Sequence, residues 1–322
     1  MCAPAGFFFR LDPEWTVGRL LLSIASLPAT AALLLAPSTG WGCAVCSCGD
    51  PTLTTMGAEQ PFAGRLRLAV EATSRSDAVG APGVDQVLLL DQALTGSVAW
   101  SPADRWQVAL SVPVGRRTAE DVSLARTTVW APGDAVVRTR WAALRGTPSR
   151  GSALAGLGGG LRLPTAPVVR RPDGTVLPMS AQLGTGTTTA TLGGWGFRSI
   201  GPWSTYASAE GWVPVVALSP PRDAFPSEPG LSGRATVAGQ WQPLRWGAVR
   251  TSAEGRLDQP ATLDGAPEPD TGGAVLFSRL DLLLTPQTDL VIQAGVSLPV
   301  VQALSGHHRE GAALALGVTV DL

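Results

Sequence analysis

The sequence predicts an all-β protein: a twelve-stranded antiparallel up-and-down transmembrane β-barrel that follows an N-terminal signal peptide. Three observations carry this prediction. Segments of alternating polar and apolar residues recur through the chain, their lengths suit a tilted membrane-spanning strand, and the connections between them alternate between long and short. The 322 residues also include 38 Gly and 27 Pro, which disfavour a mostly helical fold.

The N-terminus has the pattern of an export signal. An apolar run covers 20–37, two arginines precede it, and small residues follow it. This arrangement is typical of a secretory signal peptide. A transmembrane helix is the alternative, but Pro28 lies in the middle of the run. We therefore expect residues 1–42 to be signal peptide and leader, with cleavage between Ser38 and Cys43.

The strand prediction follows from the direction of the side chains. Successive side chains of a strand point to opposite faces, so Leu66, Leu68 and Val70 point one way while Arg65 and Arg67 point the other. Most such segments have about the length of a tilted transmembrane strand, which needs about nine to eleven residues. The twelve expected strands cover 62–75, 87–100, 105–115, 134–144, 152–164, 182–197, 203–213, 232–242, 248–258, 273–284, 289–300 and 311–322.

The connections alternate in length along the chain. The short ones are 101–104, 145–151, 198–202, 243–247 and 285–288, and the long ones are 76–86, 116–133, 165–181, 214–231, 259–272 and 301–311. Outer-membrane barrels have an even number of strands, short periplasmic turns and longer external loops. A soluble sandwich has no need of this alternation. We therefore expect residues 62–322 to form a barrel in the outer membrane of a Gram-negative bacterium, with both termini in the periplasm.

Tryptophans collect at the ends of the expected strands that have short turns. Indole rings favour the membrane interface, where the ring is in apolar surroundings and the N–H is hydrated. The alternative is a set of strand-end aromatics in a sandwich core. Seven of the eleven tryptophans fall at these ends: Trp100, Trp106, Trp141, Trp195, Trp203, Trp241 and Trp246.

Charged residues occupy the non-lipid face of the expected strands. Placing them on the lipid face would cost about 2–4 kcal/mol each near the midplane. Eleven arginines face six acids there, which favours an anion-preferring channel; a plugged barrel with paired interior charges is the alternative. The predicted pore lining is Arg65, Arg67, Glu71, Arg105, Arg138, Arg140, Arg162, Glu210, Arg234, Arg250, Glu254, Arg256, Arg279 and Asp281, and Arg75, Asp91 and Asp321 share this face.

Three cysteines lie within six residues in the expected periplasmic segment 43–61. Thiolates of Cys43, Cys46 and Cys48 at this spacing suit a soft metal ion, either Cu(I) or, with a fourth ligand, Zn(II). A local disulfide that leaves one thiol and lipidation of Cys43 are the alternatives. Each would give the segment a different role, and the spacing alone leaves all three open.

Other function classes find little support. The net charge of -1 disfavours a nucleic-acid partner, because such proteins carry a basic excess. No nucleophile or metalloprotease motif is present, and the only histidines, His307 and His308, fall in an expected loop. We therefore expect no enzyme activity.

Several short motifs resemble a family of Gram-negative outer-membrane barrels. They are GGGLRLPTA at Gly158–Ala166, QLGTG at Gln182–Gly186, PGDAVVRTRW at Pro132–Trp141 and the opening at Cys46–Gly57. These residues are similar to porin-like or transporter barrels, related to the family linked to meta-pathway phenol degradation. One departure is that the chain ends in Val320, Asp321 and Leu322 rather than in an aromatic residue.

The resemblance implies a channel or transporter for small solutes, and the arginine excess on the expected inner face favours anionic ones among them. Its expected partners are the solute, outer-membrane lipid and the barrel-assembly machinery, and the oligomeric state stays open. The alternative function is the handling of a soft metal by the cysteine segment, with the barrel as conduit or anchor.

Overall fold

The computed structural model describes residues 63–146, 152–170, 174, 176, 182–215, 227–263, 265–268, 270–287 and 289–322. The expected signal peptide and the segment 43–61 with its cysteines lie outside the described residues, so both stay predictions. The described residues form strands, turns and loops, and they contain no helix long and apolar enough to cross a membrane.

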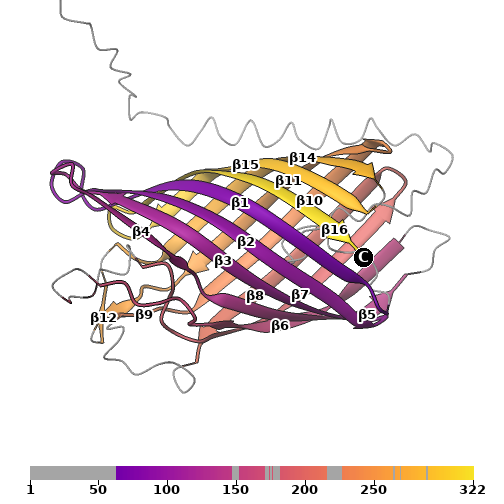
Figure 1. Cartoon of the computed structure of the whole chain (residues 1–322), viewed down its shortest axis with the longest axis horizontal. Helices are drawn as coiled ribbons and strands as arrows, with labels where there is room; N and C mark the ends of the chain where they lie inside the picture. Colours follow the sequence, from indigo (N-terminus) through magenta and orange to yellow (C-terminus); the bar gives the residue numbers. More distant parts are fainter. Residues whose placement is uncertain are drawn as a thin grey trace, which may run out of the picture. The chain divides into compact units, whose positions relative to one another are not determined.

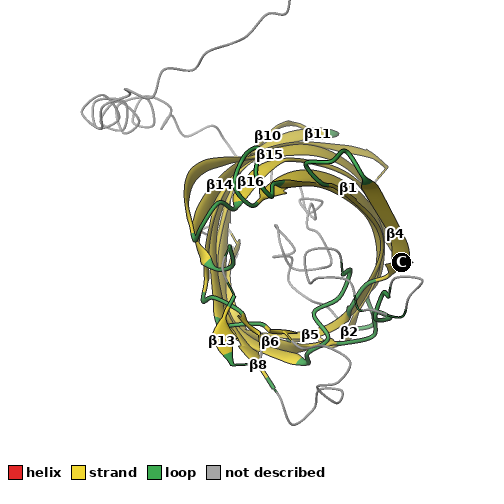
Figure 2. Ribbon diagram, turned by 90° about the vertical axis from the view of Figure 1, so that its left-hand side faces the viewer, coloured by secondary structure: helices red, strands yellow, loops and turns green. Residues whose placement is uncertain are grey.

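Twelve long strands pair into a closed ring. Each is antiparallel to its neighbours along the chain, and the first pairs with the last, so the sheet closes on itself (Figure 1 and Figure 2). The predicted all-β, twelve-stranded antiparallel barrel is thereby confirmed. The strands are β1 (Leu66–Val79), β2 (Val87–Ala103), β3 (Trp106–Glu120), β5 (Ala135–Arg145), β6 (Ser152–Leu163), β7 (Thr189–Ile200), β8 (Trp203–Pro214), β10 (Ser232–Leu244), β11 (Gly247–Asp258), β14 (Gly273–Gln287), β15 (Leu290–Leu304) and β16 (Arg309–Asp321).

Four short strands lie at the end of the barrel that carries the connecting loops, which we call the loop end. β4 (Arg126–Pro132) pairs with the last part of β3 and continues the line of β5 after a break at Gly133 and Asp134. β9 (Ser227–Glu228), β12 (Thr262–Leu263) and β13 (Ala266–Pro267) form a small separate sheet. The loops that follow β8 and β11 are thus hydrogen-bonded to each other.

The two faces of the barrel wall differ as the alternation predicts. On β2, Leu94 and Val98 are exposed on the outer face, whereas Ser97 is buried on the inner face. On β1, Val70 is exposed and Arg67 is buried. An apolar outer face with all backbone groups paired in a closed ring is what lipid requires of a strand protein.

Several strands extend further toward the loop end than the sequence analysis expected. β1 continues to Val79, and β15 and β16 leave only Ser305–His308 between them, where a long loop of 301–311 was expected. The strict alternation of long and short connections was therefore wrong at this loop. The reason is physical: beyond the lipid nothing enforces an apolar outer face, so the strand continues while its hydrophobic pattern fades.

The expected strand 182–197 was wrong in its first part. β7 begins at Thr189, and 182–188 is a loop whose side chains Gln182, Thr187 and Thr188 are buried. Leu183 contacts the inner side of β3, where its Cδ2 lies 3.0 Å from the position that a Cβ of Gly115 would take. This segment therefore lies against the inner face of the wall.

The other end of the barrel, which we call the turn end, has a ring of exposed tryptophans. Trp106 and Trp141 stack with ring centroids 6.3 Å apart, and Trp203 and Trp241 stack at 5.9 Å. Trp100 and Trp246 are exposed at the same end. Placing Trp195 in this outer set was wrong: its side chain is buried on the inner face, because its position in β7 has the parity of the inward side chains.

Candidate functional site

The inner face of the barrel carries nearly all the ionisable residues that the sequence predicted for it. Arg105 is the exception, because it lies in the exposed turn between β2 and β3, where strand alternation no longer fixes direction. The remaining thirteen lie on the inner face: Arg65, Arg67, Glu71, Arg138, Arg140, Arg162, Glu210, Arg234, Arg250, Glu254, Arg256, Arg279 and Asp281. Whether they line an open pore stays a prediction.

One group of inner charges joins the first and last strands at the turn end. Asp321 of β16 accepts hydrogen bonds from Arg65 at 2.5 Å and from Arg67 at 2.5 and 2.8 Å. Their side chains are almost fully buried. We call Arg65, Arg67 and Asp321 the seam cluster, because it lies where the chain closes the ring.

A second group lies on β11, β14 and β15. Asp281 forms ion pairs with Arg250 at 3.0 Å and with Arg279 at 2.8 Å. The side chains of Asp281 and Arg250 have no exposed surface. Gly295 of β15 faces the pair, and a Cβ there would lie 2.1 Å from Oδ1 of Asp281. The glycine is therefore needed for the carboxylate to occupy this position.

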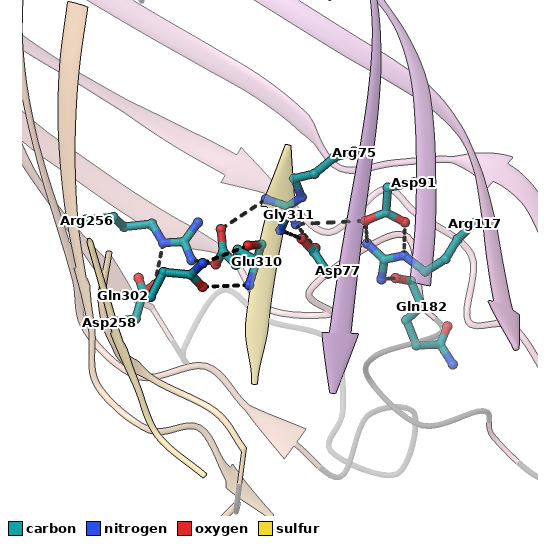
Figure 3. A network of polar contacts seen from close by, with 10 residues as sticks. All are labelled: Arg75, Asp77, Asp91, Arg117, Gln182, Arg256, Asp258, Gln302, Glu310 and Gly311. Carbon is teal, nitrogen blue, oxygen red and sulfur yellow. Dashed lines mark hydrogen bonds and ion pairs between the residues drawn. The ribbon is translucent and has the colours of Figure 1, made fainter. Parts of the chain in front are cut away.

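The third group is a network at the loop end, shown in Figure 3. Arg75 of β1 lies between three carboxylates, at 2.7 Å from Asp77, 3.7 Å from Glu310 and 3.9 Å from Asp91. Arg117 of β3 forms a two-point pair with Asp91.

The same network continues on the other side of Glu310. Arg256 of β11 pairs with Glu310 and, at 2.6 Å, with Asp258, while Gln302 holds the backbone of Glu310 through two hydrogen bonds. We call the whole set the rim network: Arg75, Asp77, Asp91, Arg117, Arg256, Asp258, Gln302 and Glu310.

The inward loop segment, residues 182–188, is fixed to the wall at two points and to the loop after β6 at a third. Arg117 donates to the carbonyl oxygen of Gln182 (Figure 3), and the Gln182 amide forms two hydrogen bonds of 2.9 Å with the backbone of Val169. Asp134, at the break before β5, accepts from the backbone and the hydroxyl of Thr185 at 2.7 and 3.0 Å. The segment therefore narrows the lumen beside β3 and β5.

The middle of the barrel contains a small unfilled space of about 40 Å³, which we call the middle chamber and which is lined by six strands, β5, β6, β7, β8, β10 and β11. On one side Arg140 donates to the Tyr206 hydroxyl at 2.8 Å and lies 5.1 Å from the ring centroid of Trp195. The other side contains Arg138, whose Nη1 lies 3.5 Å from Glu210. Such contacts join strands that are not neighbours, so these side chains meet on the concave face.

Tryptophan also meets arginine beside the chamber. The guanidinium groups of Arg138 and Arg162 lie 4.8 and 4.7 Å from the ring of Trp212, which is buried on the inner face of β8. Cation–π contacts of this kind stabilise an arginine where water is scarce. They also hold the guanidinium planes in fixed positions around the chamber.

The sequence analysis missed several charges of the inner face. Asp77, Glu310 and Arg117 fall in segments expected to be external loops, and Asp258 ends an expected strand without having been assigned a face. Extending the alternation past the membrane band would have found all four. With these included and Arg105 removed, the excess of arginines over acids on the described inner face falls from five to two.

The metal prediction receives no test from the described residues. Cys43, Cys46 and Cys48 lie outside them, and within the described ranges no group of three or more His, Cys, Asp or Glu could hold a metal ion. His307 and His308 lie in the turn between β15 and β16, where the backbone N–H of His307 donates to Asp270 at 2.6 Å. The soft-metal site therefore stays a prediction.

Comparison with known proteins gives a fold relationship. No family model and no curated protein matches the chain. Among solved structures, an outer membrane channel from Pseudomonas putida F1 is similar, with a TM-score of 0.62 and 12% identity over 82% of this chain and 98% of that chain.

Two further solved structures are more distant. The translocator domain of the autotransporter NalP from Neisseria meningitidis has a TM-score of 0.49 and 12% identity over 94% of this chain and 95% of that chain. The CymD monoaromatic hydrocarbon channel has a TM-score of 0.43 and 9% identity over 89% and 95%. The resemblance to the family linked to phenol degradation stays a prediction. What the similarity to the Pseudomonas channel shows is the architecture: this chain has the fold of an outer-membrane β-barrel.

Proposed function

We propose that this protein is an outer-membrane channel for small solutes. The observation that carries the proposal is the contrast between the two faces of a closed ring: an apolar outer face and an inner face with at least eleven arginines and nine acids among the described residues. Ionisable groups at membrane depth are expensive, and they typically mark a solute or ion pathway. A barrel that served only as an anchor would have no need of so many.

The lumen is polar but not uniformly filled. This supports a route for solutes through the barrel rather than a sealed lumen. Unfilled spaces occur beside Arg75, Arg117 and Leu183 (about 300 Å³) and in the middle chamber (about 40 Å³). Twelve strands lie between barrels of about eight, which side chains fill, and those of sixteen, which hold water. We infer that solutes pass a narrow route beside the inward loop segment.

The turn end faces the periplasm in this proposal. Three of its turns in the described ranges have two residues each, at 104–105, 201–202 and 245–246, and the described chain enters and leaves the ring there. Short periplasmic turns and longer external loops are the usual arrangement of bacterial barrels. Insertion by the barrel-assembly machinery belongs to the same proposal.

Anion preference is expected to be moderate rather than strong. The inner face keeps an excess of two arginines, but most of its charges lie in ion pairs, which weakens their field in the lumen. Nothing in the described residues favours the metal-handling alternative.

A liposome-swelling assay tests the proposal. The mature chain, purified from outer membranes and reconstituted into liposomes, should admit small carboxylates and small sugars, and the rate should fall steeply as solute size increases. Heat-unfolded protein is the matched control. Liposomes that exclude even the smallest solute, although the protein is folded by heat-modifiable migration on gels, would contradict a channel.

A further inference from the structure

The outer face of the barrel carries a group of arginines at the loop end. Arg116 of β3, Arg126 of β4 and Arg309 of β16 point away from the lumen, and all three are exposed. Their strands belong to one side of the barrel, where β16, β1, β2, β3 and β4 are neighbours in the sheet (Figure 1). We call these three residues the outer arginine patch.

The register of the sheet places the two ends of the patch in one row. Arg309 lies opposite Ala78, and Ala78 lies opposite Leu88. Leu88 lies opposite Glu120, which in turn lies opposite Arg126. Side chains directly opposite each other point to the same face. Four strand spacings of about 4.8 Å therefore separate the two ends by about 19 Å along the sheet.

A depression lies within the patch. Ser76 and Ala78 are small, and Leu88 beside them is exposed and apolar. The volume of the depression is about 530 Å³, which lies in the usual range for a small-molecule site. Asp77 and Glu310 also border it, but their side chains are 5% and 1% exposed and belong to the rim network on the inner face.

The patch has more positive charge than its neighbours compensate. Arg126 pairs with Glu120 at 2.6 Å. Within the part of the chain that the structure describes, the side chains of Arg116 and Arg309 have neither a hydrogen bond nor an ion pair. Three arginines beside one outward-facing acid leave an excess of two positive charges, which attracts an anionic partner.

The patch begins where the apolar band of the outer face ends. On β3 the outward residues from Trp106 to Val114 are all apolar, and the next outward residue is Arg116. On β16 the outward residues between Val318 and Arg309 are likewise apolar. Ten residues of about 3.3 Å each, tilted by about 40°, span about 25 Å, which is the usual height of the apolar band. With Trp106 at one interface, Arg116 is therefore level with the lipid headgroups of the other.

The outward residues elsewhere at the loop end are different. There β8, β11 and β14 present Val213, Leu257 and Leu276 to the outside. The arginines are thus gathered on one side of the barrel. This distribution indicates a local site rather than a belt of positive charge around the whole barrel.

We propose that the outer arginine patch binds a phosphorylated lipid headgroup of the outer leaflet, with phosphate at Arg116 and Arg309 and an acyl chain against Leu88. The planar guanidinium matches a phosphate through two parallel hydrogen bonds. A lipid satisfies both the cations and the apolar surface, whereas a soluble phosphate satisfies only the cations. The proposal rests on the orientation given above, with the loop end outside, and not on the passage of solutes.

Lipid binding to the purified, folded chain in micelles of a non-ionic detergent tests the proposal. Diphosphoryl lipid A is the probe, phosphatidylcholine is the lipid without net charge, and glucose 1-phosphate is the phosphate without an acyl chain. Lipid A should bind saturably, at about one per chain and at least about tenfold more tightly than the other two, because only it satisfies both halves of the site. Equal binding of phosphatidylcholine would overturn the proposal, and so would equal binding of glucose 1-phosphate, which would show an anion site without a lipid.

Paired variants locate the site. Arg116→Gln with Arg309→Gln removes two exposed charges, so this double variant should fold normally and weaken lipid A binding at least about tenfold. Arg105→Gln with Arg245→Gln is the matched control, because it removes two charges from exposed turns at the turn end, and it should bind lipid A as the unmodified chain does. Arg116→Lys with Arg309→Lys should keep most of the affinity, because lysine also binds phosphate, as a point charge.

Each outcome bears on a different claim. Unchanged lipid A affinity in the glutamine pair, with heat-modifiable migration retained, would overturn the patch as the site. A dimer of the chain in light scattering that the same pair of substitutions dissociates would assign the patch to a second copy and overturn the lipid. Lipid A binding without flux of any solute would overturn only the proposed channel.

Discussion

Arg256 of β11 and Glu310 of β16 form an ion pair although β14 and β15 lie between their strands. A contact of this kind requires both side chains to reach across the concave face of the barrel. Glu310 is almost completely buried, and it also lies 3.7 Å from Arg75. At this level the wall is therefore tied together by charge rather than by apolar packing.

Removing this carboxylate should destabilise the barrel. Glu310→Gln leaves Arg256 and Arg75 with a weaker partner in a buried site, and breaking a buried pair in this way costs about 3–5 kcal/mol. Urea unfolding in micelles, followed by tryptophan fluorescence, measures the change. Glu120→Gln is the matched control, because Arg126, the partner of Glu120, is 70% exposed, and its loss should cost about 1 kcal/mol or less.

The fully buried pair of Arg250 and Asp281 should show strong coupling. In a double-mutant cycle, Arg250→Gln and Asp281→Asn should give an interaction free energy of about 1–3 kcal/mol. The same cycle on Arg126 and Glu120, at the exposed hairpin, should give about 0.2–1 kcal/mol. Equal coupling in both cycles would show that Arg250 and Asp281 are hydrated in the folded barrel.

Release of the inward loop segment from the wall should widen the proposed solute route through the lumen. Asp134→Ala removes the acceptor that binds the backbone and hydroxyl of Thr185, so 182–188 should leave the wall more often. The expected result is a larger and noisier single-channel conductance and faster cleavage of this segment by added protease. Asp85→Ala, which removes the acceptor of Ala81 in another loop-end connection, should leave the conductance unchanged.

Tryptophans at the membrane interface should contribute more to the stability of the barrel than tryptophans outside it. Trp241→Ala removes a ring that stacks on Trp203 at the turn end, and stacked pairs contribute about 0.5–1.5 kcal/mol beyond their buried area. Refolding equilibria in bilayers should show a loss of at least this size. Trp130→Ala, in β4 beyond the ring, should change stability by about 0.5 kcal/mol or less. If Trp130→Ala cost more stability than Trp241→Ala, the assignment of the membrane interface to the turn end would be contradicted.

The sequence was sufficient for the wall of the barrel because lipid imposes a simple rule on it. The positions of Leu94 and Val98 on one face and Ser97 on the other follow from alternation alone. The rule lapses outside the lipid. For this reason the extensions of β15 and β16, the role of Glu310 and the exposed position of Arg105 were not predicted.

The lumen contacts were harder to predict for a different reason. Alternation shows that Arg138 and Arg140 point inward, but their partners Glu210 and Tyr206 are about seventy positions away on a non-adjacent strand. Such contacts depend on the curvature and register of the closed sheet, which no local pattern encodes. The loop 182–188 was misread because glycine and threonine alternate over 184–187 and lead into the alternation of β7, while Asp134 and Arg117 hold the loop against the wall instead.

Single-channel recording in a planar lipid bilayer tests the central claim most directly. The mature chain, purified in folded form from outer membranes, should produce discrete conductance steps in potassium chloride. Under a salt gradient the reversal potential should show a moderate preference for chloride, and Arg138→Gln should reduce it. A folded chain that inserts into the bilayer yet gives no steps would contradict the channel, and a clear preference for potassium would contradict the charge assignment of the lumen.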